Sequence, residues 1–192
     1  MEIKNVKFET SVYDKKQLNF NDKKQIVLVG KSNVGKSSFI NAICNNSKLA
    51  KVGNTPGKTK SINYYNVNDT FYIVDLPGYG YSKMSFSEKE NVANLINYYL
   101  KNGNICHIFM LVDIRHKPTS DDKDMYNYLV AYNIPFTIIA NKADKLSSKA
   151  TKENMDVIIK ELFAKEEIIA FSGEKKLNVD IVKNIIDTVT ND

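Results

Sequence analysis

Apolar segments of strand length alternate along this chain with segments of helical periodicity. The strand-like segments are almost continuously apolar, which is typical of strands buried on both faces of a parallel sheet. Between them, apolar residues recur every three to four positions, as on one face of a helix. The expected strands are residues 25–30, 71–75, 106–114, 136–140 and 167–172, and the expected helices are residues 36–46, 87–102, 120–132, 148–165 and 178–189.

One further strand and the absence of breaks complete the predicted fold. Residues 61–69 are strand-like, and we expect them to pair with residues 70–74 through a short turn. Strands that alternate with helices predict a three-layer α/β protein with a mostly parallel sheet and one antiparallel edge strand. No repeat, low-complexity tract or linker is visible. We therefore expect one domain over residues 1–192, in which residues 1–24 lead into the first core strand.

Helix starts also carry sequence signals. Ser85 and Glu88 have the spacing of a capping box, and Asn178 is expected to cap the last helix. In an open sheet of this kind, ligands bind beyond the carboxyl ends of the strands. The motifs that follow strand ends are therefore the candidates for function.

Composition narrows the class of protein. Of the 192 residues, 43% are hydrophobic and 26% are charged, as in soluble globular proteins. Neither a signal peptide nor an apolar stretch of roughly 20 residues is visible, and Cys44 and Cys106 lack metal-ligand spacing. We therefore expect a cytoplasmic protein with no membrane or DNA partner. The net charge of +5 favours an acidic partner such as RNA, although a solvated lysine surface explains it as well.

The segment "GKSNVGKS" follows the first core strand. Gly30 and Gly35 let the backbone curl so that successive N–H groups point at phosphate oxygens. Lys36 is expected to reach the terminal phosphates, and the Ser37 hydroxyl to bind Mg²⁺. Between a strand and a helix, this pattern predicts a nucleoside-triphosphate site and not a plain turn.

Asp75 ends the strand at residues 71–75 and begins an Asp-x-x-Gly pattern. Its carboxylate can hold a magnesium-bound water, and the N–H of Gly78 can donate to a terminal phosphate. The same composition occurs in ordinary turns. The prediction therefore depends on the place of the motif, one strand beyond the phosphate loop.

The motif "NKAD", residues 141–144, follows the strand at residues 136–140. The carboxylate of Asp144 can accept hydrogen bonds from the ring N–H and the exocyclic amine of guanine, a pair of donors that adenine lacks. Alone, the motif would be read as a turn or a helix cap. After two phosphate motifs it predicts GTP, and not ATP, as the ligand. The backbone N–H groups of Ser172 and Gly173 either meet the guanine carbonyl or form a simple turn.

The segment "KVGNTPGKTKS", residues 51–61, has the composition of a mobile loop. Thr55 or Thr59 could supply a second hydroxyl for Mg²⁺. Such a loop becomes ordered when the terminal phosphate is present and is released after hydrolysis. The alternative is a flexible linker without nucleotide contact.

Six stretches together resemble the EngB family of bacterial ribosome-biogenesis GTPases: "GKSNVGKSSFIN", "NTPGKTKSIN", "DLPGYGYSK", "DIRHKPTSDD", "NKADK" and "FSG". The resemblance runs from about Val6 to the end of the chain, and "TPGKT" and "DLPGYGY" are more specific than general GTPase motifs. It implies a Ras-like G domain of the P-loop NTPase class. It also implies a role in assembly of the large (50S) ribosomal subunit, and so in normal growth and cell division.

Carried onto this chain, the resemblance assigns roles to residues. Ser37 and Thr59 would bind Mg²⁺, with Asp75 acting through a water. Lys36, Thr59 and Gly78 would stabilise the transition state. The residues expected to bind GTP or GDP are Gly30, Lys31, Ser32, Asn33, Val34, Gly35, Lys36, Ser37 and Ser38, then Gly57, Lys58, Thr59, Lys60 and Ser61, then Asp75, Leu76, Pro77 and Gly78, then Asn141, Lys142, Ala143 and Asp144, and last Phe171, Ser172 and Gly173.

Several residues depart from the family pattern or have no assigned role. Lys31 stands where the family usually has arginine, which keeps the charge. Gly173 replaces a more common serine and Asn178 a usual glycine, and we expect these two changes to weaken contacts at the base. Arg115 and His116 could be catalytic, could mark a partner surface, or could simply be polar residues at a strand end.

Tyr79 stands where many small GTPases carry the glutamine that orients the attacking water. A tyrosine is a poor base near neutral pH, so we expect slow intrinsic hydrolysis and can name no catalytic base. In cation-dependent GTPases, an asparagine at the position of Asn33 helps to hold a potassium ion in place of an arginine finger. We therefore expect K⁺ to stimulate hydrolysis.

The leading interpretation is a monomeric switch that docks on rRNA of the large ribosomal subunit with GTP and leaves after hydrolysis. Three alternatives stay open: a GTPase of tRNA modification or of a membrane process, a P-loop phosphotransferase, and a structural rRNA-binding module whose nucleotide only stabilises the fold. The lysines that could contact RNA, or could simply be solvated, are Lys15, Lys16, Lys23, Lys24, Lys48, Lys51, Lys58 and Lys60.

Overall fold

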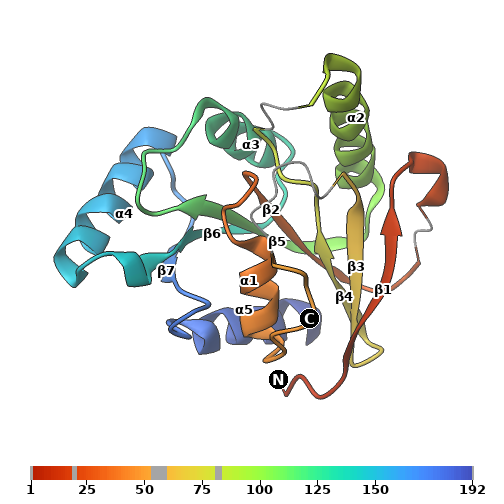
Figure 1. Ribbon diagram of the computed structural model, residues 1–192, viewed down its shortest axis with the longest axis horizontal. Coiled ribbons are helices and arrows are strands. Elements are labelled where there is room, and N and C mark those ends of the chain that lie inside the picture. The colour runs from red at the N-terminus through yellow and green to blue at the C-terminus, as the bar shows by residue number, and fades with distance from the viewer. Residues whose placement is uncertain (1, 19–20, 53–59, 81–83, 192) are drawn as a thin grey trace.

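The computed structural model describes residues 2–18, 21–52, 60–80 and 84–191. In this part of the chain, helices cover a single seven-stranded sheet (Figure 1). The strands are β1 (Val6–Val12), β2 (Gln25–Gly30), β3 (Ile62–Val67), β4 (Phe71–Asp75), β5 (Ile105–Asp113), β6 (Phe136–Asn141) and β7 (Ile168–Phe171). The helices are α1 (Lys36–Ile43), α2 (Phe86–Asn102), α3 (Ser120–Ala131), α4 (Ser148–Leu162) and α5 (Val179–Asn191), with short 3₁₀ helices η1 (Lys15–Gln17) and η2 (Ala143–Lys145).

The strands lie in the order β1-β3-β4-β2-β5-β6-β7. β2 pairs in parallel with β4 and β5, and the parallel pairing continues through β6 to β7. β3 alone runs in the opposite direction, antiparallel to both β1 and β4. The predicted α/β class with a mostly parallel sheet is confirmed. The structure adds β1 outside the antiparallel strand, in a segment to which the sequence analysis assigned no element.

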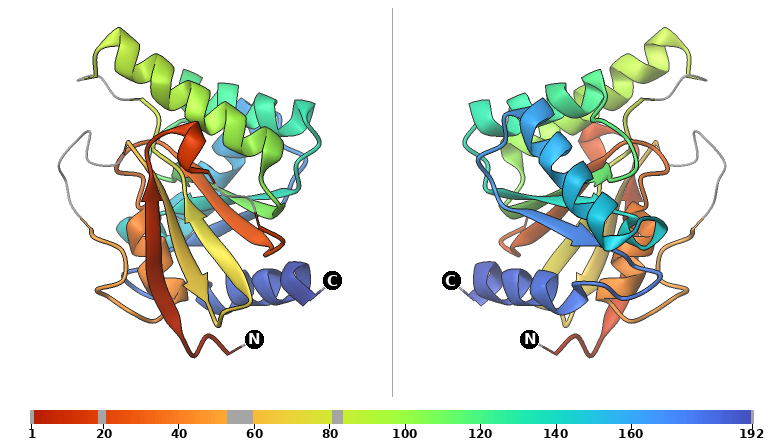
Figure 2. Two further views of the ribbon diagram at one scale, coloured as in Figure 1. Left: turned by 90° about the vertical axis from the view of Figure 1, so that its right-hand side faces the viewer. Right: turned by 90° about the vertical axis from the view of Figure 1, so that its left-hand side faces the viewer.

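Helices cover the sheet on both faces, with α2, α3 and α4 on one side and α1 and α5 on the other (Figure 2). Alternate residues of β2 enter the two cores. Val27 and Val29 pack with residues of α2, α3 and α4, whereas Ile26 and Leu28 pack with residues of α1 and α5. A strand buried on both faces needs apolar residues at every position, which explains the continuous apolar run in the sequence.

Capping residues and left-handed backbone conformations determine where several helices begin and end. The predicted capping box is confirmed, because Ser85 Oγ accepts from the N–H of Glu88 and the Glu88 carboxylate accepts from the N–H of Ser85. α1 and α4 end earlier than predicted, at Ile43 and Leu162, because left-handed residues follow them at Asn45 and Phe163 (φ 48° and 53°). A left-handed residue cannot continue a right-handed helix.

Asn178 immediately precedes α5 in a left-handed conformation (φ 57°). Its side-chain amide donates to the carbonyl of Ala170 at 2.7 Å and so ties the start of α5 to β7. Glycine and asparagine are the residues that most readily adopt this conformation. Asparagine can therefore stand at a position whose backbone conformation otherwise favours glycine.

Candidate nucleotide-binding site

Four of the predicted segments lie at one edge of the sheet. The phosphate loop follows β2, Asp75 ends β4, Asn141 ends β6 and Ser172 follows β7. These strands are parallel, so their carboxyl ends point the same way (Figure 1). The structure therefore brings the predicted phosphate and base motifs to the same edge of the sheet.

The phosphate loop is held in shape by the base motif. Gly35 has a left-handed backbone (φ 108°), and Asn141 Nδ2 donates to the carbonyl oxygen of Val34 at 2.8 Å. A Cβ atom on Gly35 would lie 2.3 Å from that same Nδ2. Asn33 is also left-handed (φ 64°) and exposed, whereas Val34 is buried in the core beside α1.

Lys36 and Asp75 form a buried ion pair next to the phosphate loop. Lys36 Nζ lies 3.3 Å from the carbonyl oxygen of Gly30 and 4.0 Å from Asp75 Oδ1. Burial lowers the pKa of Lys36, although Asp75 opposes this effect. Burial also raises the pKa of Asp75 to about 6, with Lys36 acting in the opposite direction. Among the described residues, Asp75 Oδ1 has no hydrogen-bond donor.

The segment after Asp75 packs directly on the phosphate loop. The backbone N–H of Ser32 donates to the carbonyl of Tyr79 at 3.0 Å. A Cβ atom on Gly78 would lie 2.8 Å from the Ser32 nitrogen, so no side chain fits there. Leu76 and Pro77 are buried. The predicted phosphate-sensing segment is therefore in direct contact with the predicted phosphate-binding one.

The hydroxyl of Tyr79 is engaged in a hydrogen bond and is not available as a base. Its hydroxyl donates to Asp122 Oδ1 at 2.7 Å, and burial raises the pKa of Tyr79 well above its usual value. The other Asp122 oxygen accepts from the N–H and the hydroxyl of Thr119, which caps α3. Tyr79 thus joins the Asp-x-x-Gly segment to the start of α3 as a neutral hydrogen-bond donor.

Lys142 provides a second link between the base motif and the phosphate loop. Its ammonium group donates to the carbonyl oxygen of Asn33 at 2.9 Å and to Asp113 Oδ2 at 2.9 Å. The neighbouring Ala143 is buried. Asn141 and Lys142 therefore each bind one carbonyl of the phosphate loop, so the base motif also supports the phosphate-binding backbone.

Asp144, the residue expected to bind guanine, is held by two neighbours. Its Oδ1 accepts from the Ser172 hydroxyl at 2.6 Å, and its Oδ2 lies 2.9 Å from Lys145 Nζ. Burial opposes ionisation, but the hydrogen bonds from Ser172 and Lys145 outweigh it and lower the pKa of Asp144. The side chain is only 5% exposed, so its oxygens have a fixed orientation.

The structure gives Ser172 a role that the sequence did not indicate. Its N–H, which we expected to meet the guanine carbonyl, donates to the carbonyl of Leu177 at 3.4 Å, while its hydroxyl orients Asp144. Phe171, before it, is fully buried. Gly173 lies against α1, where a Cβ atom would be 2.9 Å from the carbonyl oxygen of Ser38.

Part of the predicted set lies outside the described residues, namely Thr55, Gly57, Lys58 and Thr59. The two residues that follow are described and have other partners. Lys60 Nζ lies 2.5 Å from Glu88 Oε1 at the start of α2. The buried Ser61 hydroxyl donates to Asn63 Oδ1 at 3.1 Å.

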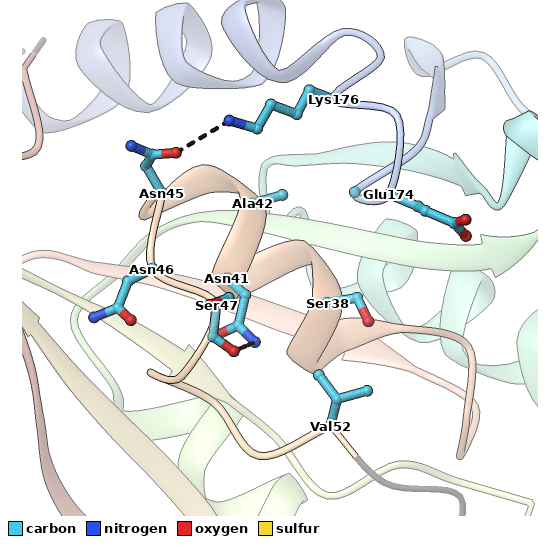
Figure 3. Close-up of a pocket in the computed structure, with 10 residues that line it drawn as sticks. Ser38, Asn41, Ala42, Asn45, Asn46, Ser47, Val52, Glu174 and Lys176 are labelled. Atoms are coloured by element: carbon cyan, nitrogen blue, oxygen red, sulfur yellow. Dashed lines mark hydrogen bonds between the residues drawn. The ribbon is translucent and has the colours of Figure 1, made fainter.

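A cavity of about 530 Å³ borders this site. Figure 3 shows side chains of α1 and of the segment after it on one side, with Glu174 and Lys176 opposite. The cavity shares Ser38 and Gly173 with the predicted nucleotide site, whereas neither Lys36 nor Asp144 lines it. It therefore flanks the candidate site and does not contain its charged groups.

Of the two residues that the sequence left without a role, Arg115 joins the site through Asp113 and Lys142, and His116 does not. Arg115 donates from Nε and Nη2 to the two oxygens of Asp113, at 2.8 and 2.7 Å. The side chain of His116 is exposed. A polar stretch at the end of a buried strand was the sequence signal, but it did not identify Asp113 as the common partner.

Comparisons with known proteins agree on one family. A family model described as "50S ribosome-binding GTPase" matches residues 25–142. The chain is 42% identical to the "Probable GTP-binding protein EngB" of Thermoanaerobacter pseudethanolicus, over 97% of this chain and 98% of that protein. It is 42% identical to the protein of the same name from Clostridioides difficile, over 94% and 90% of the two chains. The corresponding protein of Mycoplasma capricolum is 43% identical, over 92% of each chain.

Solved structures share the fold. A "probable GTP-binding protein engB" superposes with a TM-score of 0.71 at 24% identity and covers 87% of this chain and 98% of that one. Aquifex aeolicus Era bound to GDP and AlF₄⁻ has a TM-score of 0.64 at 26% identity, over 86% and 56% of the two chains. Era in complex with MgGDPNP and a segment of 16S ribosomal RNA has a TM-score of 0.64 at 25% identity, over 87% and 57%.

Proposed function

Because this chain belongs to the EngB family of GTP-binding proteins, we propose that it is a GTP-driven switch needed for assembly of the large (50S) ribosomal subunit. As a GTPase it converts GTP to GDP and phosphate. The observation that carries the nucleotide-binding part of the proposal is the set of hydrogen bonds from Asn141 and Lys142 to the phosphate loop. Through these bonds, one connected site can bind both the base and the phosphates of one nucleotide.

The nucleotide would lie along this connection. Its phosphates would meet the backbone N–H groups of residues 30–38 and the ammonium of Lys36. Its guanine would donate to Asp144, whose oxygens Ser172 and Lys145 already orient. A buried, ionised carboxylate discriminates against adenine, because adenine cannot donate two hydrogen bonds to it.

The residues present fit a magnesium ion that arrives with the nucleotide. Mg²⁺ keeps several waters and takes few protein ligands. The buried Asp75 Oδ1, which accepts no hydrogen bond from the described residues, is suited to accept from such a water, and Ser37 offers a hydroxyl at the start of α1. The second predicted hydroxyl, of Thr59, lies outside the described residues. When bound, Mg²⁺ would neutralise charge on the terminal phosphates.

We propose slow intrinsic hydrolysis, because the described site offers no group placed to activate the attacking water. Tyr79, at the position where a glutamine is common, is neutral and already donates to Asp122. The residues proposed to stabilise the transition state are Lys36, Thr59 and Gly78. The exposed, left-handed Asn33 is the proposed ligand of a potassium ion.

The potassium proposal predicts a salt effect on turnover. The rate of GTP hydrolysis should be higher in potassium chloride than in sodium chloride at equal ionic strength, since the proposed ligand Asn33 would hold K⁺ and not the smaller Na⁺ beside the phosphates. In the Asn33→Ala variant the two rates should become similar. Equal turnover of the wild type in the two salts would contradict the proposal.

The ribosomal target is supported by the family description and by the charge of the chain. The matching family is described as 50S ribosome-binding, and the net charge of +5 favours an RNA partner. We propose that a cytoplasmic monomer docks on rRNA or ribosomal proteins. A GTPase of tRNA modification or of a membrane process is the second candidate. Among the described residues, no helix is long and apolar enough to cross a bilayer.

Replacing Lys36 separates a nucleotide-dependent switch from a structural rRNA-binding module. The Lys36→Ala variant, supplied in place of the wild type, should cause incomplete large subunits to accumulate on sucrose gradients, because it cannot hold the terminal phosphates. Lys101→Ala, an exposed lysine of α2, is the matched control and should support normal assembly. If folded Lys36→Ala also supports normal assembly, the nucleotide cycle is dispensable and the switch proposal is wrong.

A further inference from the structure

Asp113 lies between the two strands that carry the nucleotide motifs. It ends β5, which pairs with β2 on one side and with β6 on the other. In this register Asp113 is directly opposite Asn141, the first residue of the base motif. A side chain at this point can reach both the phosphate loop and the base motif.

The Asp113 carboxylate is fully occupied by two cations. Its Oδ1 accepts from the N–H and from Nε of Arg115, at 3.1 and 2.8 Å. Its Oδ2 accepts from Arg115 Nη2 at 2.7 Å and from Lys142 Nζ at 2.9 Å. Burial opposes ionisation, but the bonds from Arg115 and Lys142 outweigh it and hold the pKa of Asp113 well below its usual value.

Lys142 has little freedom of its own. Its backbone is left-handed (φ 68°), and its ammonium group is shared between Asp113 Oδ2 and the carbonyl oxygen of Asn33. A lysine side chain normally loses considerable rotational freedom when it is fixed in one geometry. The carboxylate and the carbonyl together therefore define where this long side chain lies.

We propose that Asp113 and Arg115 are positioning residues that hold Lys142 against the phosphate loop and thereby slow the release of guanine nucleotide. The proposal rests on the nucleotide site proposed above and assigns a role to the "DIRH" stretch. Arg115 fixes the plane of the carboxylate with two parallel bonds, and the carboxylate then places Lys142 on Asn33.

Loss of the Asp113 charge would weaken the contact between Lys142 and the phosphate loop. Arg115 and Lys142 would become neighbouring cations without a carboxylate between them, and their repulsion would move Lys142 away from the phosphate loop. The three side chains are between 19% and 38% exposed, so solvent screens part of the effect. We expect GDP to dissociate about tenfold faster from the Asp113→Asn variant.

A double-mutant cycle tests the connection. Dissociation of a fluorescent GDP analogue would be measured for the wild type, Asp113→Asn, Lys142→Ala and the double variant. If Asp113 acts through Lys142, its substitution should add nothing once Lys142 is alanine. Equal acceleration by Asp113→Asn in both backgrounds would overturn the proposal, as would an unchanged rate in the single variant.

Two further variants complete the design. Arg115→Lys keeps the charge but cannot make two parallel bonds, so it should give a smaller acceleration of the same kind. Asp124→Asn, an exposed aspartate of α3, is the matched control and should leave GDP release unchanged. Failure of the wild type to bind GDP would instead refute the proposed nucleotide site. Tight binding by the wild type with no effect of Asp113→Asn would refute the positioning role alone.

Discussion

Gly35 occupies a position where even one additional carbon atom would disturb two motifs. Its backbone is left-handed, and a Cβ atom would lie 2.3 Å from Asn141 Nδ2, the atom that donates to the Val34 carbonyl. The need for glycine therefore comes from the local turn and also from a residue more than 100 positions later in the chain.

The Gly35→Ala variant should lose nucleotide affinity and stability together. Either the phosphate loop must move or Asn141 must give up its hydrogen bond to Val34. We expect at least tenfold weaker GDP binding and a loss of about 2 kcal/mol in the free energy of unfolding. Fluorescence titration and urea unfolding measure the two effects. Gly103→Ala, outside the site, should keep full affinity, and an unchanged affinity in Gly35→Ala would refute this view of the loop.

At this scale the sequence predicted which residue types gather at the site, but not their protein partners. Gly30, Lys36, Asp75 and Asp144 lie at or after the ends of parallel strands of one sheet, and their position at one edge follows from topology. The bond from Ser172 to Asp144 joins residues that are 28 positions apart and leaves no periodic signal in the sequence. Such partners require the tertiary structure.

At the scale of elements, strands buried on both faces were predictable, whereas the edge strand β1 was not. β1 pairs with β3 through backbone hydrogen bonds, and four of its seven side chains are exposed. A strand with so few buried residues lacks the apolar run or the alternation by which strands are recognised. α1 and α4 end earlier than predicted, where a residue other than glycine adopts a left-handed conformation, and the other helix ends lie within two residues of the prediction.

The pairing of β5 with β6 contains a pH-sensitive contact outside the site. His107 of β5 is 8% exposed, and its Nε2 lies 3.0 Å from the Thr137 hydroxyl of β6. Burial lowers the pKa of His107 to about 4. The unfolded chain therefore binds a proton more readily than the folded one between about pH 6.5 and pH 4, and stability falls as the pH decreases through this range.

Replacement of His107 should flatten this dependence. Between pH 7 and pH 5 the wild type should lose about 2 kcal/mol of unfolding free energy through this histidine. His107→Gln keeps a polar group near Thr137 and should not show that loss. Urea unfolding at several pH values measures the slope. The exposed His116 provides the control, since His116→Gln should keep the slope of the wild type. The same slope in His107→Gln as in the wild type would contradict the assignment.

At the scale of the whole molecule, the predicted nucleotide contacts gather at one edge of the sheet. One segment expected to respond to the terminal phosphate begins there, at Asp75. Of the other, residues 51–61, the described Lys60 pairs with Glu88 of α2. A change in the bound nucleotide would therefore act first on this edge and on the start of α2. A partner that distinguishes GTP from GDP should bind here.

Co-sedimentation with purified large ribosomal subunits tests the central claim most directly. The protein would be loaded with GDP or with a non-hydrolysable GTP analogue, at low and at physiological salt. We predict that it sediments with the subunit at physiological salt only when loaded with the analogue. Binding that is the same with either nucleotide, and lost as the salt concentration rises, would contradict a GTP-gated role and would leave only the attraction of lysines to rRNA.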